Sequence, residues 1–262
     1  MEQNYVFDDL RIRQSYDLAI ASGIGRRDSQ QDAAYLAATD DDVIAVVCDG
    51  MGGIDGGHLA SATAVEAFVE HYQVYTQHCS ADFSWMQRAA AEVDDIVYGL
   101  TDASGNRIGA GTTLLSVAVH GDRLHWLSVG DSRIYILRND EIAQVTNDHN
   151  YFLRLNQQRA EGSISPEKYH QEARNGEALI SFIGMGGLIM MDVNDDAFQL
   201  YSGDVVLLCT DGMYRTVMED EIKTILLEST TMREAADYLE NLIAYRAVPY
   251  QDNYTYILIK IK

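Results

Sequence analysis

Two aspartates stand where a carboxylate could bind a cation instead of only shaping a turn. Asp49 directly follows the apolar run 43–48, and Asp211 is separated by one threonine from the apolar run 205–209. A glycine follows each aspartate; it would let the backbone turn sharply and bring its carbonyl oxygen close enough to act as a ligand. Because a carboxylate at the mouth of a buried strand loses hydration, its placement there makes sense if it binds a cation.

Three further aspartates have comparable settings. Asp131 follows a short apolar stretch and a glycine, Asp252 precedes the last apolar run of the chain, and Asp32 precedes a short strand that leads to a turn at residue 40. Isolated carboxylates with few histidines favour Mg²⁺ or Mn²⁺, because zinc sites prefer Cys and His. A single Asp-Gly pair is more often only a turn, so the prediction of a metal site rests on the joint pattern.

Short strands and two helical blocks must position these acids. The apolar runs predict strands over residues 18–22, 43–48, 113–119, 124–129, 133–138, 205–209 and 255–261. Helical periodicity predicts one pair of helices over residues 59–78 and 85–100, and a later pair over 218–227 and 231–243. Turn residues at 40–42, 120–122 and 139–140 predict antiparallel hairpins, so we expect sheets packed face to face with helices outside.

Composition and charge limit the classes of partner. The chain has 262 residues, with 40 Asp and Glu against 19 Lys and Arg, which gives a formal charge of −21. Nucleic acids and anionic membrane surfaces would repel such a surface, so we expect neither as a partner. No apolar run reaches the roughly 18 residues of a membrane helix. A cytoplasmic location and reduced thiols at Cys48, Cys79 and Cys209 are therefore expected.

The chain is expected to form a single domain over residues 1–262. No repeat, low-complexity tract or linker-like stretch divides it. Between about 150 and 191 the apolar pattern weakens into polar residues, short helical pieces and glycines, which predicts an insertion or flap on the sheet.

At these motifs the sequence resembles the metal-dependent protein phosphatase (PPM) family, the type-2C serine/threonine phosphatases, in its compact bacterial form. The similarity runs in order from about residue 22 to 261. It is carried by the segments Arg27-Asp28-Ser29-Gln30-Gln31-Asp32, Asp49-Gly50-Met51-Gly52-Gly53, Gly111-Thr112-Thr113, Gly130-Asp131-Ser132-Arg133, Thr210-Asp211-Gly212-Met213 and Asp252-Asn253.

The resemblance implies an α+β fold, a four-layer α-β-β-α sandwich of two antiparallel sheets flanked by helix pairs, with a flap insertion. It also implies a centre of two Mn²⁺ or Mg²⁺ ions. Asp49 would bridge both ions and the Gly50 carbonyl would bind one, while Asp211 and Asp252 would hold the other. Asp32 would contact the centre through metal-bound water.

Two more residues take roles from the same resemblance. Asp131 matches a third, weaker metal position, which Asp211 would share. Arg27 matches the arginine that grips the substrate phosphate, and a planar guanidinium suits that task; the neighbouring Arg26 is expected to be an ordinary surface residue. Met51 stands where eukaryotic members carry a histidine acid, so no side-chain acid is predicted.

The implied activity is hydrolysis of phosphoserine and phosphothreonine by direct attack of a metal-bridging hydroxide. The partners would be phosphorylated proteins and an opposing serine/threonine kinase, and a monomer is expected. One alternative is a catalytically inactive regulatory module that keeps the fold and binds phosphoproteins. Another is a metallohydrolase of small phosphorylated molecules.

Overall fold

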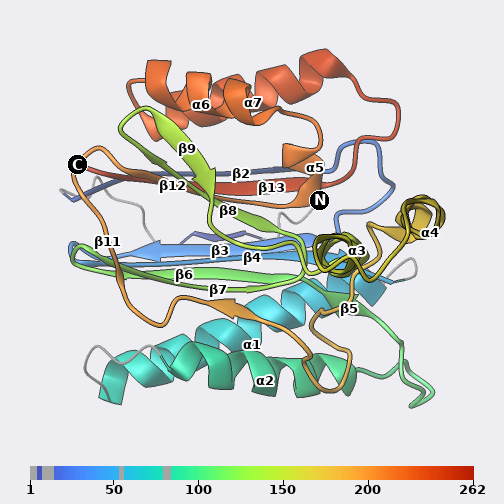
Figure 1. Ribbon diagram of the computed structural model, residues 1–262. Coiled ribbons are helices and arrows are strands. Elements are labelled where there is room, and N and C mark those ends of the chain that lie inside the picture. The colour runs from blue at the N-terminus through green and yellow to red at the C-terminus, as the bar shows by residue number, and fades with distance from the viewer. Residues whose placement is uncertain (1–4, 8–14, 53–55, 79–83) are drawn as a thin grey trace.

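The protein is a four-layer sandwich in which two β-sheets lie face to face and a helix pair covers each outer side (Figure 1). The computed structural model describes residues 5–7, 15–52, 56–78 and 84–262; Gly53 of the Asp-Gly-Met-Gly-Gly motif and Cys79 lie outside these ranges. This architecture agrees with the α+β sandwich predicted from the sequence.

The larger sheet has the strand order β1-β3-β4-β6-β7-β10. Its long antiparallel strands are β3 (Asp32–Ala38), β4 (Asp42–Met51), β6 (Leu114–His120) and β7 (Arg123–Val129). Shorter strands complete it: β1 (Tyr5–Phe7) parallel to β3, β5 (Gly111–Thr112) on β4, and β10 (Asp192–Val193) and β11 (Phe198–Gln199) on β7.

The smaller sheet is fully antiparallel, with the order β2-β13-β12-β8-β9. Its strands are β2 (Tyr16–Gly23), β8 (Arg133–Arg138), β9 (Glu141–Gln144), β12 (Val205–Cys209) and β13 (Tyr254–Ile261). The β8–β9 hairpin turns through Asn139 and Asp140, with φ of 51° and 61°, and residues of these types tolerate that left-handed backbone. The hairpin predicted at 139–140 is confirmed.

The helix pairs form because each has one apolar stripe to bury. On the larger sheet lie α1 (Gly56–His78) and α2 (Trp85–Tyr98), and on the smaller sheet α6 (Glu219–Glu228) and α7 (Met232–Arg246). Helical periodicity predicts a buried stripe of Ala60, Ala64, Phe68 and Tyr72 on α1; the first three are fully buried and Tyr72 is half-buried. Thr231 caps α7 by accepting a hydrogen bond from the Glu234 N–H at 3.1 Å.

Three apolar layers hold the sandwich together. One lies between the two sheets, and one lies beneath each helix pair. Burial of this apolar surface is the main favourable contribution to folding. Among the described residues, no helix combines the length and apolarity needed to cross a bilayer. Cys48 and Cys209 are free and buried.

The flap segment consists of short elements, as the weakened pattern predicts. It contains α3 (Tyr151–Ala160), α4 (Pro166–Glu172) and a 3-10 turn, Ala173–Asn175. Its far end is fastened to α2, because the buried Asp94 carboxylate accepts hydrogen bonds from the N–H groups of Gly184 and Gly187 at 2.7 and 2.6 Å. The segment therefore has a defined position beside the end of the sandwich where α5 lies (Figure 1).

Two differences from the sequence prediction matter for the site. The strand expected over 43–48 continues to Met51, so Asp49 lies within β4 and not beyond its end. Asp211, expected in a loop, begins a short helix, α5 (Asp211–Tyr214). β4 is longer because β3 and β5 pair with Asp49, Gly50 and Met51. α5 is instead closed by its own hydrogen bond, from the Arg215 N–H to the Asp211 carbonyl at 2.9 Å. The apolar run, which alone guided the prediction, shows neither feature.

Candidate metal centre

Asp32 and Asp49 lie directly opposite each other on the paired strands β3 and β4. Asp32 is only 2% exposed, and one of its oxygens, Oδ2, accepts a hydrogen bond from the Thr210 hydroxyl at 3.0 Å. Its other oxygen, Oδ1, is buried without a hydrogen-bond partner among the described residues. Such an oxygen is a ready acceptor for a cation or for water held by one.

Burial and mutual repulsion make both carboxylates resist ionisation. Burial is the main reason that the pKa of Asp32 is raised to about 7, and the nearby Asp211 and Asp252 raise it further. Burial raises the pKa of Asp49 well above its usual value, with added repulsion from Asp32, Asp211, Asp131 and Asp252. The other four predicted aspartates thus all lie within electrostatic reach of Asp49, and a divalent cation would relieve this repulsion.

Backbone contacts hold Asp49 while leaving its side chain available. The Asp49 N–H donates to the Thr113 hydroxyl at 2.9 Å, and the Asp49 carbonyl accepts from the Thr112 hydroxyl and the Thr113 N–H, also at 2.9 Å. The Gly111-Thr112-Thr113 motif therefore anchors β4 at the position where its carboxylate emerges.

Close backbone approach requires the glycine after each key aspartate. A Cβ on Gly50 would lie 2.1 Å from the Gly57 carbonyl oxygen, and one on Gly212 would lie 1.9 Å from the Asn253 carbonyl oxygen. Neither glycine has a positive φ, so the sharp-turn explanation offered by the sequence was wrong. Gly212 lets α5 pack against the segment that carries Asp252, and this brings Asp211 and Asp252 together.

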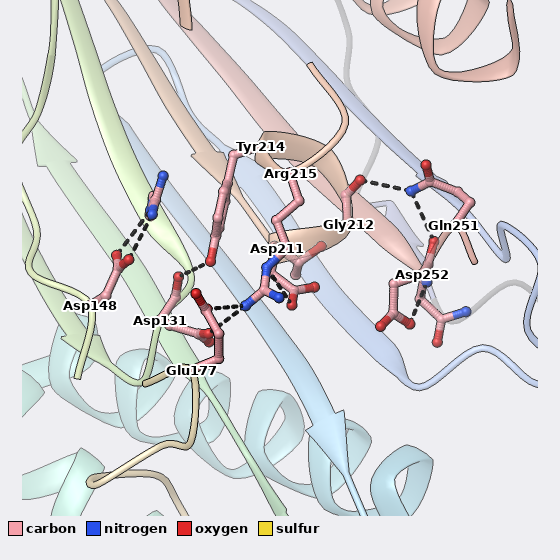
Figure 2. A network of polar contacts seen from close by, with 12 residues as sticks. Asp131, Asp148, Glu177, Asp211, Gly212, Tyr214, Arg215, Gln251 and Asp252 are labelled. Atoms are coloured by element: carbon pink, nitrogen blue, oxygen red, sulfur yellow. Dashed lines mark hydrogen bonds and ion pairs between the residues drawn. The ribbon is translucent and has the colours of Figure 1, made fainter. Parts of the chain in front are cut away.

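Arg27 and Asp252 form an ion pair at the exposed side of the centre. The Arg27 side chain is 56% exposed, so its guanidinium can be reached from solvent. Gln251 fixes the segment before Asp252 by donating a hydrogen bond from Nε2 to the Gly212 carbonyl at 2.7 Å (Figure 2).

Asp131 and Asp211 are joined on the other side of the centre by Arg215. Its Nε lies 3.2 Å from Asp211 Oδ2, and its Nη2 lies 3.6 Å from Asp131 Oδ2 and 2.7 Å from Glu177 Oε2. Figure 2 shows the guanidinium between these three carboxylates. Burial, with repulsion from Asp211, raises the pKa of Asp131 to about 7 despite the opposing effect of Arg215.

The donor chemistry of the centre fits hard cations, although its side chains are not gathered around one point. In the described part of the chain, no three His, Cys, Asp or Glu side chains converge tightly enough to coordinate an ion as they stand. Asp252 and Asp211 are instead each engaged by an arginine. The carboxylate oxygens, and above all the unpartnered Oδ1 of Asp32, match the ligands that Mg²⁺ and Mn²⁺ prefer.

A hollow of about 780 Å³ opens beside Arg215, between the flap segment and the ends of β8, β9 and α5. Asp148, Glu177 and Arg133 are among its lining residues. Arg133 is already held by Asp148 through two hydrogen bonds of 2.9 and 2.7 Å. Tyr214 and Arg215, which both contact Asp131, also line this hollow.

Sequence reasoning missed Arg215 and Glu177. Arg215 had a usable signal, because it lies four residues after Asp211 and such a pair meets on a helix, but that stretch was not expected to be helical. Glu177 had none, because its contact depends on where the flap segment lies. His149 is fully buried, and its Nδ1 accepts a hydrogen bond from the Gly130 N–H at 3.2 Å, so its contact is structural.

Comparisons with known proteins agree with this fold. The family model for protein phosphatase 2C matches residues 21–245. The chain is 29% identical over 238 residues to the serine/threonine phosphatase stp of Listeria innocua, covering 90% of this chain and 91% of that one. It is 26% identical to the serine/threonine protein phosphatase PstP of Mycobacterium tuberculosis, over 83% of this chain and 39% of that protein.

Solved structures of serine/threonine phosphatases share this fold. The serine/threonine phosphatase of S. agalactiae superposes with a TM-score of 0.78 at 25% identity, over 94% of this chain and 100% of that one. The catalytic domain of PstP in complex with two manganese ions superposes with a TM-score of 0.73 at 24% identity, over 94% and 98%. With a family model that covers most of its length, the chain belongs to the protein phosphatase 2C family.

Proposed function

We propose that this protein is a metal-dependent serine/threonine protein phosphatase whose metal centre lies at the end of the sandwich. The observation that carries the proposal is the meeting of Asp32, Asp49, Asp211 and Asp252, from distant parts of the chain, with raised pKa values at the first three. Further support comes from relatives named as serine/threonine phosphatases and from the manganese-bound structure of one relative.

The proposed ligands divide the work as the family resemblance suggests. Asp49 would bridge two divalent ions, the Gly50 carbonyl would bind one of them, and Asp211 and Asp252 would hold the other. Asp32 would act through a water, which agrees with its unpartnered Oδ1. When bound, divalent ions neutralise phosphate charge and lower the pKa of a bound water towards roughly 7.

We propose that water attacks phosphorus directly: its oxygen forms the new P–O bond as the ester P–O bond breaks, and its proton ends on the released serine or threonine oxygen, which leaves the free hydroxyl and inorganic phosphate. The two described cysteines do not offer an alternative nucleophile. Burial raises the pKa of Cys209 to about 12 and raises that of Cys48 further still, so neither supplies a thiolate near neutral pH.

Arg27 is the proposed phosphate clamp. Its exposed guanidinium pairs with Asp252 at the edge of the centre, where it can turn two N–H groups toward phosphate oxygens. Its neighbour Arg26 is also exposed and serves as a matched control, because both side chains have the same charge and size.

Phosphorylated proteins are the proposed substrates. With a formal charge of −21, the protein would attract phosphosites flanked by Lys or Arg and repel acidic ones. We further propose that the protein is a cytoplasmic monomer and that it opposes a serine/threonine kinase. Residues 1–262 would form one catalytic domain, with its flap at about 150–191. The free, buried Cys48 and Cys209 fit a reducing compartment.

Phosphate release from a phosphothreonine peptide tests the proposal. The purified protein would be assayed with Mn²⁺, with Mg²⁺ and with chelator, beside Asp49→Asn, Asp211→Asn and the exposed control Asp40→Asn. We expect turnover that requires metal, is abolished at the two site aspartates and is unchanged in the control. Metal binding without phosphate release from any ester would favour the inactive regulatory module, and turnover of small esters alone would favour the small-molecule hydrolase.

A further inference from the structure

Arg215 lies where the family resemblance places a third metal ion. That position is defined by Asp131 and Asp211, and the guanidinium contacts one oxygen of each, at 3.6 Å from Asp131 Oδ2 and 3.2 Å from Asp211 Oδ2. Asp131 lies just before β8 and Asp211 begins α5, so Arg215 ties together two segments that are distant in sequence (Figure 2).

A guanidinium and a metal ion would compete for this place. Both need the same carboxylate oxygens, and two cations in one small site repel each other strongly. Arginine remains protonated at every working pH, so it cannot give up its charge to admit an ion. The charge of Arg215 acts on both acids, because it counteracts the rise that burial causes in the pKa of Asp131 and of Asp211.

A third carboxylate holds Arg215 in this position. Glu177 Oε2 lies 2.7 Å from Arg215 Nη2, and Glu177 belongs to the flap segment, just beyond the 3-10 turn Ala173–Asn175. Tyr214 adds a second tie, because its hydroxyl donates to the Asp131 carbonyl at 3.1 Å. The Arg215 side chain is 44% exposed, so these contacts, and not burial alone, define where its guanidinium lies.

We propose that Arg215 replaces the third metal ion in this protein, so that the centre takes two divalent ions and none binds between Asp131 and Asp211. Arg215 is then a positioning residue: it holds Asp211 for the inner ions and couples the flap, through Glu177, to the centre. This inference rests on the proposed function only in assuming that the inner site binds two ions.

Counting bound manganese tests the inference without measuring activity. The protein would be equilibrated by dialysis at Mn²⁺ concentrations well above those that saturate the inner site, with free Mn²⁺ quantified by electron paramagnetic resonance. The variants are Arg215→Ala, Asp131→Asn and the two combined, and circular dichroism would confirm that each is folded. Arg174→Ala, which removes an arginine from the flap segment outside this cluster, is the matched control.

The expected counts separate the possibilities. We expect two ions in the unmodified protein, in Asp131→Asn and in Arg174→Ala, and a third in Arg215→Ala that disappears in the combined variant. A third ion in the unmodified protein that Asp131→Asn removes would overturn the inference, as would a count that stays at two in Arg215→Ala. A protein that binds no manganese at all would instead overturn the proposed function.

Discussion

The two ends of the metal centre use opposite means to stabilise their carboxylates. At the inner end Asp32 and Asp49 face each other across β3 and β4, and neither has an ion-pair partner within the described part of the chain. At the outer end Asp131 and Asp211 share the guanidinium of Arg215. The inner pair is therefore incomplete without an external cation, whereas the outer pair carries its own. At the outer end the chain itself thus supplies the cation that Asp32 and Asp49 must take from solution.

The largest expected effect follows removal of an inner carboxylate. Asp49→Asn should lower kcat/KM for a phosphothreonine peptide by on the order of 100- to 1000-fold or more, by analogy with loss of one transition-state charge contact. It should also raise the stability of the metal-free protein by about 1–3 kcal/mol, because it removes a buried, repelled charge. Thermal unfolding in chelator and in Mn²⁺ measures the second effect.

A merely structural aspartate would behave differently. Its replacement would lower the melting temperature in chelator, and the stabilisation by Mn²⁺ would persist. That result for Asp49→Asn would show that the inner carboxylates, like the outer ones, do not need an added cation, and the two ends would then not differ. The exposed Asp40→Asn, with the same change of charge, should alter neither quantity.

Arg27→Ala sharpens the comparison, because Arg27 pairs with Asp252 at the exposed side of the centre and not with the inner Asp32 and Asp49. We expect KM to rise about 10- to 100-fold with a smaller change in kcat, the cost of one charge-assisted contact to phosphate. Steady-state kinetics with Arg26→Ala alongside measure this. Equal loss in both arginine variants would show a general effect of surface charge and would exclude a specific clamp.

The inner end should also make stability depend on pH. Because burial raises the pKa of Asp32 in the folded protein to about 7, above its unfolded value of about 3.9, the folded state binds the proton more tightly. The contribution of Asp32 to stability in chelator is then fully present below about pH 4 and is lost as pH rises to 7, by at most about 1.4 kcal/mol per pH unit.

Denaturant unfolding between pH 4.5 and 8 measures this slope. Asp32→Asn should flatten the decrease of stability with pH. Saturating Mn²⁺ should counteract this decrease, because metal and proton compete for the same carboxylates. The many other acidic groups of the protein contribute a slope of the same sign. The informative quantity is therefore the difference between the slope of the unmodified protein and the slope of Asp32→Asn. Identical slopes would mean that Asp32 is not the buried acid described.

The smallest expected effect is at the outer end, where Glu177 pairs with the half-exposed Arg215. Glu177→Gln should cost only about 0.2–1 kcal/mol, as exposed ion pairs do, but it should loosen the flap. Hydrogen exchange would report faster exchange around residues 173–179. The control Glu161→Gln changes a flap carboxylate that bonds only within its own segment, to Gln157. Equal acceleration in both variants would mean that Glu177 does not couple the flap to Arg215.

The fold was predictable because its signals are local. Alternating apolar runs and turn residues predicted the principal strands, and the stripes of Ala60, Ala64 and Phe68 predicted which helix faces are buried. The short edge strands β1, β10 and β11 were not predicted, since two or three residues carry no periodicity. Their pairing depends on the sheet already formed beside them.

The site was only partly predictable. Asp49 and Asp211 were found because each follows a buried strand, and the structure brings them together with Asp32, Asp131 and Asp252. The reason for Gly50 was not found, because the approach of the Gly57 carbonyl is a tertiary contact. Arg215 illustrates the same limit: its helical spacing from Asp211 is local, but its contacts with Asp131 and Glu177 are not.

An anomalous-difference map at the manganese absorption edge, from crystals grown with Mn²⁺, tests the central claim most directly. We expect two peaks at the inner end, within coordination distance of Asp49, and none between Asp131 and Asp211, with Arg215 still in contact with both. A map with no peak beside Asp49, or with a peak that has displaced Arg215, would contradict it.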